Sequence, residues 1–196
     1  MKGADLAGHS GNDEIGTPQW LFDMLDRRFQ FDYDAAASHE NRKTHIYSTV
    51  DGTFSCGSYG PWVGPPQLYV DGDGLGFRWK GRRVFVNPPY SRPLMGQFIQ
   101  KAIDERNNAE VVVMAVKYDA STENGRLLRE HFHLEYLPRI QYEYPKAVIE
   151  EMRAKAEATA RKKGKTLPAN WTPPAATFPS VIAIVKPDFI RPGKEK

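Results

Sequence analysis

The chain has 196 residues, of which 40% are apolar and 12% aromatic, so it can bury the core of one domain. Its single cysteine, Cys56, excludes an intrachain disulfide. No signal peptide or long apolar segment predicts contact with a membrane, and the histidines lack metal-ligand spacing. We therefore expect a soluble, cytoplasmic protein without a metal. The net charge of +3 identifies no partner by itself.

The first half of the chain predicts one helix and one strand. Residues 1–15 are polar and are expected to form a flexible tail. Thr17 as N-cap and Pro18 as first helical residue begin a helix over about 18–28. A strand is predicted over Phe31–Ala37, and the Gly- and Pro-rich stretch 51–74 is predicted to be a long binding loop.

The second half continues the alternation of helices and strands, and its last residues, 191–196, are expected to form a tail. The predicted elements are the strand Arg83–Val86, a helix from Met95 to Ile103, the buried strand Val111–Val116, a short helix capped by Thr122, extended segments at 134–137 and 140–142, a helix over 146–163 and the strand Val181–Val185. This order predicts an α/β sheet with helices on both faces.

The segment Asn87-Pro88-Pro89-Tyr90 follows a buried strand and predicts a site for a planar amine. The Asn87 side-chain oxygen and the Pro88 carbonyl can accept the two hydrogens of an –NH2 group. Pro89 stiffens the turn, and Tyr90 offers a flat face to a base. The alternative interpretation is a rigid turn after a strand.

Ligands of α/β sheets bind beyond the carboxyl ends of the strands, where we expect both Asp34 and Asn87. The two side chains are therefore predicted to share a crevice. The small residues 35–37 would let a ligand approach the backbone. Ordinary tight packing between a strand and a helix is the alternative explanation for these alanines.

A series of short motifs runs through the chain. The motifs are Thr17-Pro18-x-Trp20-Leu21-Phe22, Phe31-Asp32-x-Asp34-Ala35-Ala36-Ala37-Ser38, Asn41, Asp73-Gly74-Leu75, Trp79, Asn87-Pro88-Pro89-Tyr90-Ser91, Phe98, Lys101-Ala102, Arg139-Ile140 and Pro179-Ser180-Val181. Together they resemble the phage-type DNA N6-adenine methyltransferase family (Dam family) over about residues 14–144 and 178–187. The Asn-Pro-Pro-Tyr element alone is shared with other amine methyltransferases.

The resemblance implies a class I S-adenosylmethionine-dependent fold with a largely parallel seven-stranded sheet and a reversed last hairpin. It places the methyltransferase domain at 16–190, with variable insertions at about 51–71 and 145–177. It implies that Thr17 and Pro18 contact the methionine part of S-adenosylmethionine, and that Asp73 and Leu75 lie near its adenine. The turn beneath the cofactor would comprise Asp34, Ala35, Ala36 and Ser38.

The function that the resemblance implies is N6 methylation of a flipped-out adenine in double-stranded DNA. The catalytic turn would be Asn87, Pro88, Pro89 and Tyr90. The alternatives are an N4-cytosine, RNA or protein-glutamine methyltransferase, and an inactive nucleic-acid-binding domain. Protection of a phage or mobile-element genome from restriction, in the host cytoplasm, is the role that the family suggests. The sequence predicts no oligomeric state.

The segment between Pro145 and Thr177 carries seven basic against three acidic side chains. Such a local excess is expected of an element that faces an anion. The predicted DNA-binding residues are Lys146, Arg153, Arg161, Lys162, Lys163, Lys165 and Trp171. A solvated surface helix is the alternative.

Overall fold

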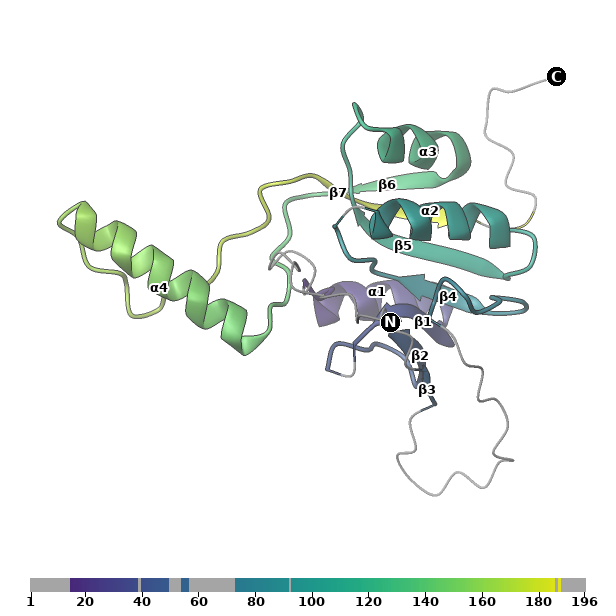
Figure 1. Ribbon diagram of the computed structural model, residues 1–196, viewed down its shortest axis with the longest axis horizontal. Coiled ribbons are helices and arrows are strands. Elements are labelled where there is room, and N and C mark those ends of the chain that lie inside the picture. Colours follow the sequence, from purple (N-terminus) through teal and green to yellow (C-terminus); the bar gives the residue numbers. More distant parts are fainter. Residues whose placement is uncertain are drawn as a thin grey trace, which may run out of the picture.

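A seven-stranded sheet with the order β3-β2-β1-β4-β5-β7-β6 forms the centre of the molecule (Figure 1). The computed structural model describes residues 15–38, 40–49, 54–56, 73–91, 93–185 and 187. The elements are α1 (Gln19–Phe29), β1 (Tyr33–Ala37), β2 (Ile46–Thr49), β3 (Phe54–Cys56), β4 (Arg83–Val86), α2 (Leu94–Glu105), β5 (Val111–Lys117), α3 (Glu123–His131), β6 (His133–Leu137), α4 (Lys146–Lys162) and β7 (Ser180–Val185).

The sheet is largely parallel and has a switch point between β1 and β4. Strands β2, β1, β4 and β5 run parallel to one another, β3 is antiparallel to β2, and β7 is antiparallel to both β5 and β6. The chain passes from β1 outward to β2 and then returns to β4 on the other side of β1. This confirms the expected largely parallel seven-stranded sheet in which β7, the last strand of the β6–β7 pair, is reversed. A crevice at such a switch point is the usual ligand site of the fold.

Helices cover both faces of the sheet, as predicted. Alternate residues of a strand point to opposite faces, so Phe85 of β4 packs with α1, whereas Val84 and Val86 pack with α2. The apolar stripe of α1 includes Phe22, whose ring packs edge-on against the Phe85 ring with 5.2 Å between the ring centroids. Strand β5 is buried from Val111 to Val116 because both faces are covered, which explains its continuous apolar run.

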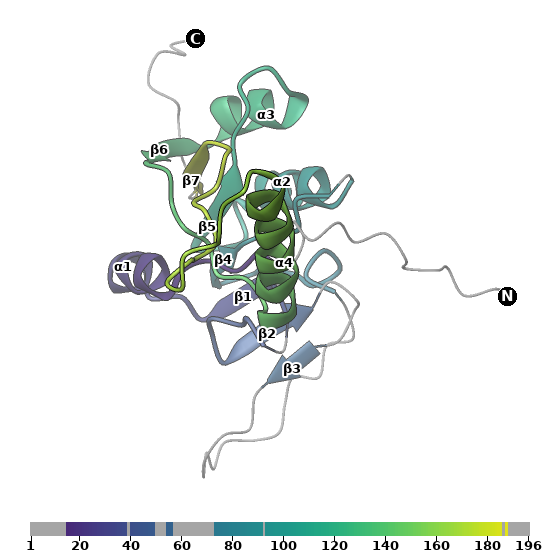
Figure 2. The same ribbon diagram turned by 90° about the vertical axis from the view of Figure 1, so that its left-hand side faces the viewer.

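The segment 145–177, which we call the arm, leaves the sheet at the carboxyl edge. Strand β6 is parallel to β5 and ends at that edge, and β7 begins there, so the connection between them must emerge on the side of Asn87. Helix α4 has no buried residue, and it projects away from the sheet in Figure 1; in the turned view of Figure 2 it lies in front of the sheet. None of the helices among the described residues is long and apolar enough to cross a membrane.

The structure corrects several sequence-based expectations at the start of the chain. Pro18 is the N-cap of α1, and the Thr17 hydroxyl caps nothing. Ile15 is buried in the core beneath α1 and so does not belong to a flexible tail. Strands β2 and β3 are elements that the sequence pattern did not predict. The expectations for 1–14, for most of 51–71 and for the end of the chain from 188 fall outside the described residues.

The N-cap predicted for α3 is confirmed. The Thr122 hydroxyl oxygen accepts a hydrogen bond from the Gly125 backbone N–H at 3.1 Å. That bond satisfies one of the backbone donors that the first turn of a helix leaves free.

Candidate active site

Asn87 stands directly after β4, and its side chain is fixed in one orientation. Its Nδ2 donates a hydrogen bond to the backbone carbonyl of Ile15 at 2.8 Å. Because only the nitrogen of the amide can donate to that carbonyl, the orientation of the group is determined. The other atom, Oδ1, is buried and has no hydrogen-bond partner among the described residues. Asn87 therefore presents a fixed and unused acceptor.

The rest of the turn is rigid. Pro88 and Pro89 are buried, and neither has an N–H to donate, so the turn offers acceptors and no backbone donor at these two positions. Tyr90 is half-buried. Its ring lies edge-on to the rings of Phe178 and Tyr142, with 5.5 Å and 6.3 Å between the ring centroids. Its hydroxyl donates to the Tyr142 hydroxyl at 3.3 Å. Burial raises the pKa of the Tyr90 phenol well above its usual value, so the ring stays neutral.

A cavity adjoins Asn87 at the switch point between β1 and β4. Its empty volume is about 200 Å³, part of it open to solvent. It is lined by Gly16, Thr17, Asp34, Ala36, Asn41, Lys43, Phe85 and Asn87. The Thr17 Oγ1 is also buried without a partner among the described residues. Since buried polar atoms are nearly always hydrogen-bonded, two such atoms in one cavity indicate a place for a polar ligand.

Asp34 lies in this cavity but within β1, not at its carboxyl end as expected. It pairs with Phe85 of β4, and β1 departs from regular pairing with β2 between Asp34 and Ala37. The carboxylate accepts hydrogen bonds from the backbone N–H of Lys43 at 3.0 Å and of Ala36 at 3.4 Å. Burial raises the pKa of Asp34 to about 6, against the lowering effect of these two bonds.

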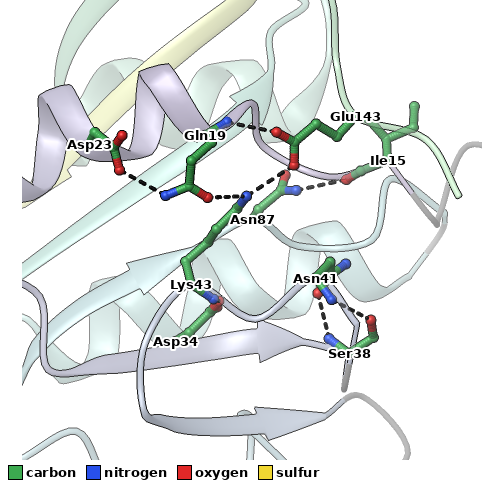
Figure 3. A network of polar contacts seen from close by, with 9 residues as sticks. All are labelled: Ile15, Gln19, Asp23, Asp34, Ser38, Asn41, Lys43, Asn87 and Glu143. Atoms are coloured by element: carbon green, nitrogen blue, oxygen red, sulfur yellow. Dashed lines mark hydrogen bonds and ion pairs between the residues drawn. The ribbon is translucent and has the colours of Figure 1, made fainter.

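An ion-pair network surrounds Lys43, one of the residues that line the cavity (Figure 3). The Lys43 ammonium donates to Glu143 Oε2 at 3.0 Å and to Gln19 Oε1 at 3.1 Å. Glu143 Oε1 accepts from the backbone N–H of Gln19, the first residue of α1, at 2.8 Å. Glu143 and Gly16 also exchange two backbone hydrogen bonds of 2.7 and 2.9 Å. The sequence reasoning missed Lys43 and Glu143, which are 100 residues apart in the chain.

Comparison with known proteins identifies the family. Residues 7–182 match the family model described as DNA N-6-adenine-methyltransferase (Dam). The chain belongs to the Dam family. A DNA N-6-adenine-methyltransferase of Haemophilus phage HP1 (strain HP1c1) is 31% identical over 116 residues, a match that covers 58% of this chain and 54% of that protein. The Dam-family chain thus spans about half the length of the curated relative that it matches.

The structure brings part of the predicted cofactor set of the Dam family together. Thr17, Asp34 and Ala36 line the cavity with Asn87, and Pro18 is buried next to Thr17. Ser38 does not line the cavity. Its backbone N–H donates to Asn41 Oδ1 at 2.6 Å, and its Oγ accepts from the Asn41 N–H at 3.2 Å. Ser38 therefore holds Asn41 in the cavity wall.

Ala35 belongs to the core and does not line the cavity. A side chain at Gly74 would place its Cβ 1.7 Å from the Ala35 carbonyl oxygen, so the two backbones are in direct contact. Ala35 is buried in the core on the α2 side of the sheet. At this position, tight packing of the chain is the explanation that the structure supports.

Asp73 and Leu75 do not reach the cavity. They belong to a turn that lies against β1 through Gly74, and the Asp73 side chain accepts from the Gly76 N–H at 2.6 Å. Leu75 packs against the core cluster that includes α2. The structure therefore separates these two residues from the predicted methionine end of the site.

The predicted DNA-binding side chains are all on the arm. The cations are exposed, and Trp171 is half-buried on the returning segment. Arg153 pairs with Glu157 at 3.3 Å, and Lys155 pairs with Glu151. Within the described part of the chain, no carboxylate is within ion-pair distance of the other arm cations, which are Lys146, Arg161, Lys162, Lys163 and Lys165. The described residues also contain no group of three or more side chains that could hold a metal ion.

Proposed function

We propose that the chain is an S-adenosylmethionine-dependent methyltransferase that acts on the N6 amine of adenine in DNA. The observation that carries the proposal is the buried, unpartnered Oδ1 of Asn87, held in place by Ile15 at the switch point of the sheet. A fixed acceptor without a partner fits a ligand that brings an N–H donor. The family and its named phage relative make adenine the expected source of that donor.

The residues of the cavity fit a polar, cationic cofactor. The buried Asp34 carboxylate can pair with a cation, and the Thr17 hydroxyl can bond to a polar group. The cavity is small, so these groups are proposed to contact only one end of the cofactor. When bound, S-adenosylmethionine supplies a methyl group on a sulfonium centre.

The catalytic turn activates the amine by accepting hydrogen bonds. The lone pair of an adenine N6 amine is delocalised into the ring, which makes the nitrogen a poor nucleophile. Asn87 Oδ1 and the Pro88 carbonyl, as acceptors of its two N–H groups, favour a tetrahedral nitrogen with an available lone pair. Both acceptors stabilise the positive charge that develops on N6, and because they are already in place they need no reorganisation. The resulting cationic nitrogen is acidic, so the turn needs no dedicated base.

The target adenine must leave the duplex to reach Asn87, at a cost of a few kcal/mol. Stacking on the Tyr90 ring, worth roughly 1–3 kcal/mol per base, offsets much of this cost. The edge-on contacts of the ring with Phe178 and Tyr142 hold it in one orientation, which supports this role.

The arm supplies the positive surface that DNA binding requires. It emerges from the same edge of the sheet as Asn87, and α4, with 17 residues, is about 25 Å long. The cations near its far end, Arg161 to Lys163, are not paired with carboxylates of the described residues. Phosphate contacts by such side chains give affinity and position without reading the sequence.

The activity can be tested in a host that lacks adenine methylation. Expression of the wild-type chain should introduce N6-methyladenine at a defined sequence, as read by single-molecule sequencing, and the Asn87→Ala variant should not. If N4-methylcytosine is found in place of N6-methyladenine, the target base is cytosine and the proposed target is wrong. If the purified protein binds both S-adenosylmethionine and DNA but leaves the DNA unmodified, the proposal is wrong and an inactive binding domain is favoured.

A further inference from the structure

The Glu143 carboxylate accepts hydrogen bonds from two groups in a positive environment, a backbone N–H at the start of a helix and a lysine ammonium. One oxygen accepts the Gln19 backbone N–H at the start of α1, at 2.8 Å, and the other accepts from the Lys43 ammonium at 3.0 Å. The amino end of a helix attracts anions through its free N–H groups and its dipole. The site is therefore built for a carboxylate, and a side chain from a distant part of the chain fills it.

The two members of the ion pair differ in burial. The Lys43 side chain is 7% exposed, whereas the Glu143 side chain is 50% exposed. Lys43 is also fixed through its backbone, because its N–H donates to the buried Asp34 carboxylate. A buried ammonium requires an anionic partner, but the identity of that partner is open. The exposed Glu143 is the member that another carboxylate can replace.

A second, independent feature of the same cavity points to a ligand. Thr17 is 1% exposed, and its Oγ1 has no hydrogen-bond partner among the described residues. Thr17 and Lys43 both line the cavity, and Thr17 is two residues from Gln19 in the chain. A ligand carboxylate next to Lys43 would bring acceptors for both side chains.

We propose that Lys43 binds the α-carboxylate of the methionine end of S-adenosylmethionine, and that Glu143 occupies this place when the cofactor is absent. The inference rests on the proposed function for the identity of the ligand. Exchange of one carboxylate for another leaves Lys43 paired in both states. Glu143 is then an internal competitor, and the apparent affinity for the cofactor is lowered by the fraction of molecules in which Glu143 holds the site.

The carboxylate contact can be isolated with two ligands. S-adenosylhomocysteine carries the carboxylate, and its decarboxylated counterpart lacks only that group. In the wild-type protein, titration calorimetry should show about 10- to 100-fold weaker binding of the decarboxylated ligand, as expected for loss of a charge-assisted hydrogen bond. In Lys43→Met the ratio of the two affinities should fall well below its wild-type value, because of the two side chains only Thr17 still contacts the carboxylate.

A matched control removes a cation from the same region without touching the cavity. Arg28 lies at the other end of α1 and pairs with Glu135. Arg28→Met should keep the wild-type ratio of the two affinities. If Lys43→Met weakens both ligands equally and keeps their ratio, Lys43 only supports the fold of the cavity and the proposal is wrong.

The Glu143→Gln variant gives a prediction of opposite sign. Glutamine keeps an oxygen to accept the Gln19 N–H but removes the charge that competes for Lys43. S-adenosylhomocysteine should therefore bind about 2- to 10-fold more tightly than to the wild-type protein, with no gain for the decarboxylated ligand. A purely structural ion pair would give weaker binding, and that result would overturn the proposal.

The control for the proposed function is the wild-type protein itself. If it binds neither ligand, the proposed cofactor is wrong. If it binds both ligands with equal affinity, the cofactor stands and only the assignment of Lys43 fails.

Discussion

The Asn87 amide is anchored to the backbone carbonyl of Ile15, with 2.8 Å between Nδ2 and the oxygen. Ile15 precedes α1 and is buried against the core, so a segment from the start of the domain orients the side chain at the end of β4. Because the amide nitrogen makes this bond, Oδ1 remains available as an acceptor. The contact fixes the polarity of the amide, which the proposed chemistry requires.

Asn87→Ala removes the acceptor for the target amine. We expect methyl transfer to fall by about 10²–10³-fold, the loss typical of removing one preorganised group from a charge-stabilising site. The affinity for S-adenosylmethionine should stay within several-fold, because the cofactor is proposed to contact other residues of the cavity. Single-turnover methylation of a DNA duplex and calorimetry measure the two effects. Turnover close to wild type in this variant would show that Asn87 is not the acceptor.

Tyr90 is proposed to act through the face of its ring. Tyr90→Phe loses only the 3.3 Å bond to the Tyr142 hydroxyl, so methylation should stay within a few-fold of wild type. Tyr90→Ala removes the stacking surface, worth roughly 1–3 kcal/mol per base, and should reduce methylation about 10- to 100-fold. A fluorescent adenine analogue at the target position would report base flipping directly. Equal damage from Phe and Ala would rule out stacking as the role.

Local sequence signals were sufficient for the elements that carry the site. The run before Asn87 predicted β4, the 3–4 spacing from Met95 predicted α2, and Thr122 was recognised as an N-cap. These features depend on residues close together in the chain. The motif residues Asn87 and Asp34 were also correctly expected to share a crevice, although Asp34 reaches it from within β1.

The features that were missed depend on contacts between distant segments. Pro18, not Thr17, is the N-cap of α1, and the first N–H of the helix is bonded by Glu143, 124 residues away in the chain. Gly74 lies directly against the Ala35 backbone and has no room for a side chain, a contact between two segments that the sequence pattern did not predict. No periodicity or local motif encodes such pairs, and they appear only when the sheet places them side by side.

Thr17→Val should separate folding from binding. The Thr17 hydroxyl is buried without a partner among the described residues, so an apolar side chain of the same shape should leave the free energy of unfolding unchanged or raise it. The affinity for S-adenosylmethionine should fall about 5- to 10-fold, since the hydroxyl is proposed to bond the cofactor. Urea denaturation and calorimetry test the two parts. Lower stability with unchanged affinity would assign Thr17 a structural role.

The raised pKa of the buried Asp34 carboxyl predicts how the stability of the fold depends on pH. Burial raises its pKa to about 6, above the value of about 3.9 in the unfolded chain. Its contribution to stability is therefore fully present below pH 4 and is lost as the pH rises through 6. The Asp34→Asn variant has no carboxyl group to ionise and so does not lose this stability. The difference in unfolding free energy between variant and wild type should therefore shift in favour of the variant by on the order of 3 kcal/mol between pH 4 and pH 7. Urea denaturation at several pH values measures the difference, and a difference independent of pH would contradict the raised pKa.

The cations at the far end of α4 should contact DNA phosphates. Replacing Arg161, Lys162 and Lys163 with Ala should weaken DNA binding and reduce the steepness of log K against log salt by up to about 2–3. With fewer phosphate contacts, fewer counterions are released from the DNA when the protein binds. Cofactor affinity should not change, since none of the three lines the cavity. The matched control removes the same charge from the opposite, amino-terminal edge of the sheet, through the exposed residues Arg27, Lys80 and Arg106. The control should keep the wild-type slope, because a bound duplex that reaches Asn87 lies at the other edge. Equal slopes for the two triple variants would show that α4 is a solvated surface helix and that the DNA-binding face must lie elsewhere.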